Sequence, residues 1–248
     1  MDQNQKYIAL VTGGTGGLGT AICKRLSNDG FHVVTSYNNA AKAEKWQQSM
    51  QAEGYNIDMY HVDVSDYASV EKMVAEVEQN LGPIDILVNN AGITRDGQFR
   101  KMTVENWDAV LKTNLYSVFN CTRNVINQMC DRNYGRIINI SSVNGQRGQF
   151  GQANYSAAKA GMHGFTKTLA MEVARKGITV NTISPGYIAT DMVMAVPEEI
   201  RNKIVAEIPI GRMGGTEEIA HLVSFLASKE ASFITGANYA INGGQHVY

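Results

Sequence analysis

Residues Thr12–Gly19 read TGGTGGLG, and this stretch decides the fold of the 248-residue chain. It follows a short apolar run, YIALV at 7–11, and it precedes TAICKRL, whose apolar residues have helical spacing. Glycine permits a tight turn and lets backbone N–H groups approach a phosphate, which the positive end of a helix also attracts. Five glycines in the seven positions 13–19, between a first strand and a helix, therefore predict a loop that binds a dinucleotide.

The glycines of this loop fit two patterns at once. Gly14, Gly16 and Gly19 match G-x-G-x-x-G, whereas Gly13, Gly17 and Gly19 match the wider G-x-x-x-G-x-G. The residues alone leave the choice between the two patterns open.

Strand-like and helical segments alternate along the rest of the chain. After YIALV come HVVTS, IDMYHV, IDILV, RIINI, ITVNTI and NYAIN, separated by segments such as AAKAEKWQQSMQAEG with apolar residues three and four apart. Seven strands with helical connections predict an α/β fold, a seven-stranded parallel sheet with helices on both faces. No flexible linker or internal repeat interrupts the pattern, so residues 1–248 are predicted to form a single doubly wound domain.

Composition narrows the class of protein. The net charge is -1 and charges of both signs are interspersed, which argues against nucleic acid or an anionic membrane surface as a partner. The first apolar run is too short for a signal peptide or a membrane span. The three cysteines, Cys23, Cys121 and Cys130, form no C-x-x-C pair and lie in helical patterns. Reduced thiols in a cytoplasmic protein are expected, and no metal site is predicted.

The end of the second strand bears on the choice of cofactor. An acid about 20 residues beyond the glycine loop usually binds the adenosine ribose. Here HVVTS is followed by Tyr37, Asn38 and Asn39, and no carboxylate appears before Glu44. An acid would repel the 2′-phosphate of NADP, so its absence favours NADP(H), with Asn38, Asn39 and Lys42 near the phosphate.

Polar residues also follow the third and fourth strands. Asp63 follows the third strand and could cap the next helix, although Ser65 and Asp66 are better placed as caps. Asp63 is then available to accept from an adenine amino group. The fourth strand runs into the Asn89–Gly92 turn, which could be only a turn or could line the nucleotide.

A tyrosine and a lysine on one predicted helix suggest chemistry. Tyr155 and Lys159 in YSAAK are four residues apart and therefore share a helix face. A tyrosine with a pKa of about 10 is a poor acid at neutral pH, and a nearby ammonium would lower that pKa. A serine at the end of the preceding strand, Ser141 or Ser142, could donate to a reacting oxygen. A Tyr-x-x-x-Lys pair alone is more often a surface pair, but this helix follows a strand that opens into the predicted crevice.

These motifs together resemble the short-chain dehydrogenase/reductase family. They are TGGTGGLG, Asp63-Val64, NNAG, the helix around Asn114, Ser142, YSAAK and SPGYIATDM, in the family's order over essentially the whole chain. The resemblance implies that the wider glycine pattern applies and that Tyr155 is the catalytic acid/base. It implies that Lys159 tunes the tyrosine and binds the nicotinamide ribose. It assigns Ser142, thirteen residues before the tyrosine, to the carbonyl and Asn114 to a water of the proton relay.

The resemblance also completes the expected cofactor site. Together with the strand-end residues, its members are Gly13, Gly14, Thr15, Gly17, Leu18, Gly19, Asn38, Lys42, Asp63, Val64, Asn90, Ala91, Gly92, Tyr155, Lys159, Pro185, Gly186, Tyr187, Ile188 and Thr190. A homotetramer assembled through the two long helices and the NYAIN strand is implied as well.

Within the family, the chain resembles the branch that reduces 3-oxoacyl thioesters. SSVNGQRGQFGQANYS and ITRDGQFRKMT are closer to acetoacetyl-CoA reductases of polyhydroxybutyrate synthesis than to 3-oxoacyl-acyl-carrier-protein reductases. This implies NADPH-dependent reduction of acetoacetyl-CoA to (R)-3-hydroxybutyryl-CoA, with the carrier-protein substrate as the alternative. The expected substrate residues are Asp96, Ser142, Gln149, Phe150, Gln152 and Tyr187. A nucleotide sensor without catalysis and a sugar or steroid dehydrogenase are less favoured.

Two further segments concern the substrate. The basic residues Arg95, Arg100, Lys101 and Arg147 could meet coenzyme A phosphates or the acidic surface of a carrier protein, so they do not discriminate. Residues 190–213 contain a proline near the start of a short amphipathic helix and no partner strand, and they are expected to form a mobile lid. A static contact between subunits is the alternative for this segment.

Overall fold

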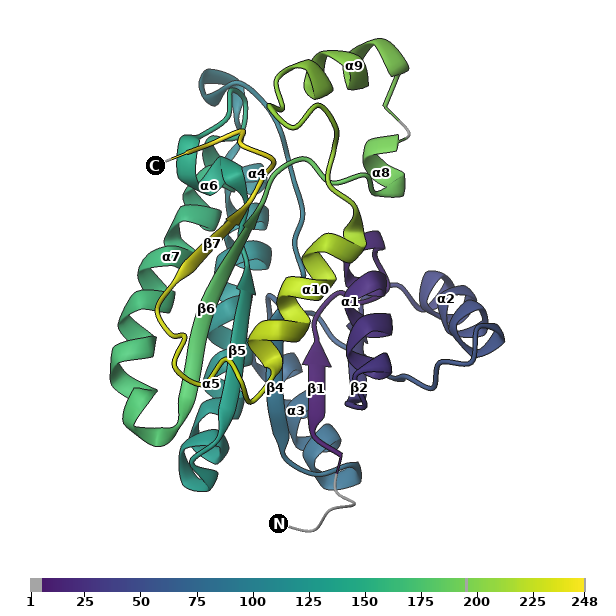
Figure 1. The fold of residues 1–248 in the computed structure, drawn as a ribbon, viewed down its shortest axis with the longest axis vertical. Coiled ribbons are helices and arrows are strands. Elements are labelled where there is room, and N and C mark those ends of the chain that lie inside the picture. Colours follow the sequence, from purple (N-terminus) through teal and green to yellow (C-terminus); the bar gives the residue numbers. More distant parts are fainter. Residues whose placement is uncertain (1–5, 195, 248) are drawn as a thin grey trace.

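The centre of the molecule is a sheet of seven strands, shown in Figure 1. The computed structural model describes residues 6–194 and 196–247. The sheet has the order β3-β2-β1-β4-β5-β6-β7, and every neighbouring pair is parallel. The strands are β1 Ile8–Val11, β2 His32–Tyr37, β3 Asp58–His61, β4 Ile84–Asn89, β5 Gly135–Ile140, β6 Ile178–Pro185 and β7 Asn238–Ile241. The predicted seven-stranded parallel sheet is confirmed.

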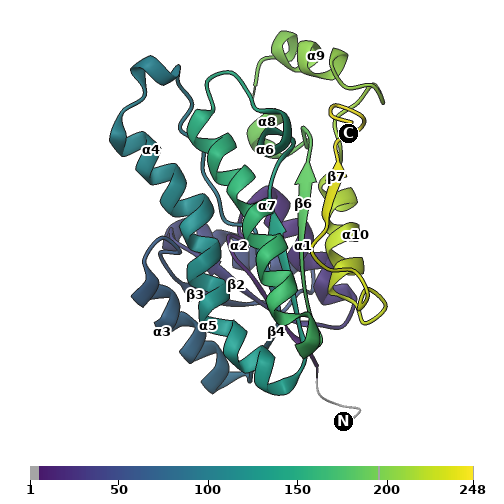
Figure 2. The ribbon, with the colours of Figure 1, turned by 90° about the vertical axis from the view of Figure 1, so that its left-hand side faces the viewer.

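Helices cover both faces of the sheet (Figures 1 and 2). One face carries α1 (Gly17–Asn28) and α10 (Thr216–Ala227), which pack against each other; α2 (Ala40–Ala52) follows β2. The other face carries α3 (Tyr67–Asn80), α5 (Ser117–Arg132) and α7 (Ala153–Val173). The shorter elements are η1 (Phe99–Lys101), α4 (Val104–Leu111), η2 (Lys112–Tyr116), α6 (Val143–Arg147), η3 (Ala174–Lys176), α8 (Asp191–Met194) and α9 (Glu198–Ala206).

The apolar residues of β1 explain why the sheet is buried on both sides. Ile8 and Leu10 pack into the core shared with α3, α5 and α7, whereas Ala9 and Val11 pack into the core shared with α1 and α10. All four side chains are buried, because successive residues of a strand point to opposite faces. The continuous apolar run at the start of the sequence therefore indicates a strand in the centre of the sheet.

The order of the strands places a crevice beside the glycine loop. β1 and β4 are neighbours in the sheet. The strand that follows β1 lies on one side of this pair, and the strand that follows β4 lies on the other side. At such a switch point the two connections diverge, and ligands bind at the carboxyl ends of the strands. The sheet thus brings the loops after β1 and β4 to one place.

Residues 190–213 stand out from the carboxyl edge as α8 and α9 (Figure 1). The sequence predicted one short helix here, and the structure has two. A parallel bridge between Ile188 and Gly214 closes the base of this segment, where Ala189 N donates to Gly214 O at 2.9 Å. Position 195, within the predicted lid, lies outside the described residues. Mobility of the segment stays a prediction.

No helix within the described ranges has the length and apolar character needed to span a membrane.

Candidate active site

Close packing or a positive φ explains three of the five glycines in the loop after β1. A Cβ on Gly14 would lie 2.0 Å from Thr35 Oγ1, and a Cβ on Gly19 would lie 2.4 Å from Gly13 O. Gly13 itself has a φ of 65°, which favours glycine. A Cβ on Gly16 would meet nothing closer than 3.6 Å. Crowding at Gly14 and Gly19 and the positive φ of Gly13 therefore require members of both sequence patterns.

The start of α1 has the properties of a phosphate site. Its N-cap is Gly16, and no side chain caps the first turn. The N–H groups of that turn are left to an external acceptor, and the helix dipole favours an anion there. Gly17 is exposed at this position, where a Cβ would meet only Thr190, at 3.3 Å. An uncapped helix start beside crowded backbone fits the pyrophosphate of a dinucleotide.

The turn after β4 is joined to this loop. Asn90 N and Ala91 N both donate to Thr12 Oγ1 at 3.0 Å, and Asn90 Nδ2 donates to Thr12 O at 2.9 Å. A Cβ on Gly92 would lie 3.4 Å from Asn114 Oδ1 and 3.7 Å from Lys159 Nζ. The turn therefore has a structural role and also links the glycine loop to the predicted catalytic residues.

After the ends of β2 and β3, some of the polar side chains cap the next helix and others are exposed. The Asn39 side chain caps α2 by accepting from Lys42 N at 2.9 Å, while the side chains of Asn38 and Lys42 are exposed. Asp66 caps α3, as the sequence suggested.

Asp63 lies just before that cap, and its exposed side chain accepts hydrogen bonds within a turn of the chain. Its Oδ1 accepts from Ser65 N at 2.9 Å and from Ser65 Oγ at 2.7 Å. Ser65 therefore supports Asp63 and does not cap the helix.

Asn114 lies in a π-helical turn, η2, between α4 and α5. Its side chain is fully buried, although an asparagine in mid-helix would ordinarily lie on the surface. Its Oδ1 accepts from Ile93 N at 2.8 Å and its Nδ2 donates to Ile93 O at 2.9 Å. Single π-turns are rare and often mark functional sites. Two hydrogen bonds to the backbone of Ile93 therefore hold the side chain of Asn114 in place.

The other three predicted catalytic residues meet at the carboxyl end of β5. Tyr155 and Lys159 lie on the same side of α7, with Nζ 5.6 Å from the centroid of the phenol ring. The tyrosine hydroxyl interacts with the side chain of Ser142, the residue that caps α6. Lys159 Nζ donates to Ile140 O at 2.6 Å. An acid, a hydroxyl donor and an amine are thus within one cluster, as a carbonyl reaction needs.

The ionisation of this pair differs from the sequence-based expectation. Burial raises the pKa of Tyr155, the Ser142 hydrogen bond opposes that rise, and the negative charge of Asp96 adds to it. Burial also lowers the pKa of Lys159 to about 7. Desolvation disfavours both charged forms, so the expected ammonium that would lower the tyrosine pKa is itself partly neutral at pH 7. The expectation of a lowered tyrosine pKa is therefore wrong for the protein alone.

The model of the short chain dehydrogenase family matches residues 7–201.

The chain belongs to the short-chain dehydrogenase family.

Its relatives are similar over almost their whole length. The acetoacetyl-CoA reductase of Cupriavidus necator is 56% identical over 241 residues, 97% of this chain and 98% of the relative. The acetoacetyl-CoA reductase of Allochromatium vinosum is 57% identical over 239 residues, 96% and 97% of the two chains. The 3-oxoacyl-acyl-carrier-protein reductase FabG of Escherichia coli is 45% identical over 240 residues, 97% of each chain. The protein is an oxidoreductase with a nicotinamide cofactor.

In this dehydrogenase, a row of hydrogen-bonded side chains lies near the catalytic tyrosine. Asn144 Nδ2 donates to Gln152 Oε1 at 3.0 Å, and Gln152 Nε2 donates to Asp96 Oδ2 at 2.9 Å. Asp96 and Gln152 were predicted to be substrate residues, and the structure brings them together. Asn144 was missed, although it follows Ser142 by two positions and is buried.

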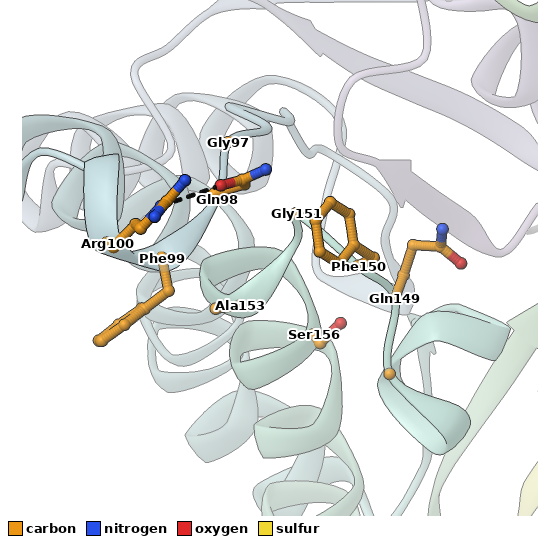
Figure 3. Close-up of a pocket in the computed structure, with 10 residues that line it drawn as sticks. Gly97, Gln98, Phe99, Arg100, Gln149, Phe150, Gly151, Ala153 and Ser156 are labelled. Atoms are coloured by element: carbon orange, nitrogen blue, oxygen red, sulfur yellow. Dashed lines mark hydrogen bonds between the residues drawn. The ribbon is translucent and has the colours of Figure 1, made fainter.

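Gln149 and Phe150, also predicted for the substrate, line a cavity of about 490 Å³ (Figure 3). Its other walls come from residues 97–100, and its floor comes from Ala153 and Ser156 of α7. The Phe150 ring is 82% exposed, so it is free to cover a ligand. Ser156 Oγ is buried there without a hydrogen-bond partner in the described part of the chain.

Tyr187 lies elsewhere, in a second cavity of about 330 Å³. That cavity is formed with Ile188, with residues 208–219 at the base of the α8–α9 segment, and with the C-terminal residues 240–244. Tyr187 N donates to Gln245 Oε1 at 3.3 Å. The structure thus separates Tyr187 from the cavity of Gln149 and Phe150.

Proposed function

We propose that this dehydrogenase reduces acetoacetyl-CoA to (R)-3-hydroxybutyryl-CoA with NADPH. The observation that carries the proposal is the convergence of Tyr155, Ser142 and Lys159 at the carboxyl edge, beside the glycine loop. The names of two similar relatives, both acetoacetyl-CoA reductases, support this substrate, and polyhydroxybutyrate synthesis would consume the product.

Each residue of the cluster has a separate role in the reduction. A reduced nicotinamide bound at the carboxyl edge would supply the hydride to the ketone carbon. Tyr155 donates its proton to the oxygen of the ketone, and Ser142 donates a hydrogen bond to the same oxygen as negative charge develops. The raised pKa keeps Tyr155 protonated, and the alkoxide that develops on the ketone is a strong enough base to take this proton. The proton of the tyrosine is replaced through Lys159 and a water held by Asn114.

The phosphorylated cofactor, NADP(H), is proposed from the end of β2. Asn38 and Lys42 expose polar or cationic side chains there, and no carboxylate lies between the end of β2 and Glu44. A 2′-phosphate would therefore meet no like charge from this strand end.

The cavity of Phe150 supports a thioester with a long carrier arm. Phe99 and Phe150 offer exposed apolar surface, and Arg100 lies at the same opening (Figure 3). An arm with an anionic end would pack its apolar part on the rings and pair its phosphate with the arginine. Coenzyme A and the phosphopantetheine of acyl carrier protein share this arm, so the carrier-protein enzyme remains the second candidate.

The proposal is tested with purified protein and both thioesters at equal low concentrations. We expect NADPH oxidation with acetoacetyl-CoA at least as fast as with acetoacetyl-acyl-carrier-protein. A strong preference for the carrier protein would overturn the substrate proposal. Tyr155→Phe should lower kcat by about 100-fold or more while NADPH still binds, measured by quenching of its fluorescence. Retention of most activity would overturn the mechanism.

We also propose a homotetramer in the cytoplasm. Large apolar side chains are exposed on the η2–α5 and α7 helices, among them Tyr116, Phe119 and Met171, and such a surface favours association. Free cysteines suit a reducing compartment. Light scattering coupled to size-exclusion chromatography tests the assembly, and a monomeric mass would contradict it.

A further inference from the structure

His163 lies one helical turn beyond Lys159 on α7 and contacts the ends of two strands. Its Nε2 is 3.0 Å from Ser141 Oγ, at the end of β5, and 3.3 Å from Ser184 Oγ, on β6. Neither the glycine loop nor the catalytic cluster described above includes this side chain.

The protons of the two serines are already used. Ser141 Oγ donates to Lys159 O at 2.8 Å, and Ser184 Oγ donates to Asn238 Oδ1 at 2.7 Å. A hydroxyl has one proton to donate, so both serine oxygens can only accept from the imidazole. Nε2 must therefore carry the hydrogen.

The imidazole N–H of His163 acts on Lys159 and Ser142 indirectly, through Ser141. Ser141 immediately precedes Ser142, and its hydroxyl holds the backbone carbonyl of Lys159. Loss of the imidazole donor would leave Ser141 Oγ free to rotate away from that carbonyl. The position of Lys159 relative to the end of β5 depends on that contact.

We propose that His163 is a positioning residue that holds Lys159 and Ser142 in register by sharing its single Nε2 hydrogen between Ser141 Oγ and Ser184 Oγ. This inference rests on the proposed function, in which Lys159 and Ser142 take part in the reduction. Burial lowers the pKa of His163, with Lys167 adding to the effect, so the imidazole is neutral when it donates.

Two substitutions separate the hydrogen bond from the shape of the ring. His163→Leu removes the donor, whereas His163→Gln places an amide N–H near the position of Nε2. We expect His163→Leu to lower kcat about tenfold, to leave the KM of the thioester within about twofold and to shift the pH profile of kcat. His163→Gln should restore kcat to within about threefold of wild type. His221→Leu, on exposed α10 surface, is the matched control.

The outcomes are distinct. Unchanged kcat and pH profile in His163→Leu, or equal losses in the Leu and Gln variants, would overturn the proposal. Imidazole ¹⁵N shifts of the wild-type protein give a readout that needs no substrate: an Nε2–H tautomer supports the donor assignment, and an Nδ1–H tautomer overturns it. A wild-type protein inactive on acetoacetyl-CoA would instead contradict the proposed function.

Discussion

Gly145 of α6 packs directly against the backbone of Lys159 in α7. A Cβ at Gly145 would lie 2.8 Å from the carbonyl carbon of Lys159 and 3.0 Å from Ala160 N. Backbone atoms cannot turn aside as a flexible side chain can, so α7 would have to move. The backbone position of the catalytic lysine therefore also depends on Gly145, a residue with no chemistry of its own.

Gly145→Ala should lower both stability and activity. Overpacking of this kind costs about 1–3 kcal/mol of the unfolding free energy, and the displaced Lys159 should lower kcat. Urea unfolding and steady-state kinetics measure the two effects. Gly164→Ala, in α7 and with open space around its Cβ, is the control and should be neutral or stabilising. Equal behaviour of the two variants would refute the packing argument.

Lys159→Met should change how stability depends on pH. The lysine has a pKa of 10.5 when unfolded and about 7 when folded, so between these values the unfolded chain binds the extra proton. Stability of the wild type therefore rises with pH over this window, and the burial penalty is fully present below pH 7. The Met variant lacks this penalty, so its stability relative to wild type should be greater at pH 7 than at pH 10. A difference independent of pH, measured by urea unfolding, would contradict the lowered pKa.

Substitution of Asp63 should affect cofactor binding, whereas substitution of Asp66 should affect stability. Asp66→Ala removes the cap of α3 and should cost about 1 kcal/mol of stability without changing the KM of the cofactor. Asp63→Asn keeps the acceptor for Ser65 but removes one carboxylate oxygen, so it should raise the cofactor KM about tenfold with little loss of stability. Thermal melts and cofactor titrations distinguish them, and an unchanged KM in Asp63→Asn would remove that residue from the cofactor site.

Asn38→Asp should weaken NADPH selectively. A carboxylate at the end of β2 would repel a 2′-phosphate, which NADH lacks, so the KM of NADPH should rise about tenfold and that of NADH should stay within about twofold. Competing kinetics with both cofactors measure the ratio. A parallel rise in both KM values would show that Asn38 does not face the phosphate.

The sequence predicted the sheet because apolar runs and helical spacing are local properties. It also placed Tyr155 and Lys159 together, since residues four apart share a helix face. The π-turn at Asn114 could not be read in this way, because it depends on the backbone of Ile93, twenty-one residues earlier. The glycine pattern was ambiguous for a similar reason, since Thr35 from another strand sets the space at Gly14. The direction of the Tyr155 pKa shift depends on burial, which spacing does not report.

The bridge between Ile188 and Gly214 has an evolutionary consequence. It fixes both ends of the α8–α9 segment to the body of the molecule, so changes of length or composition between them leave the register of the sheet intact. Such a segment can diversify at low cost to folding. Descendants of this chain could therefore carry a different excursion at this place, while the sheet and the catalytic cluster at its edge are inherited unchanged.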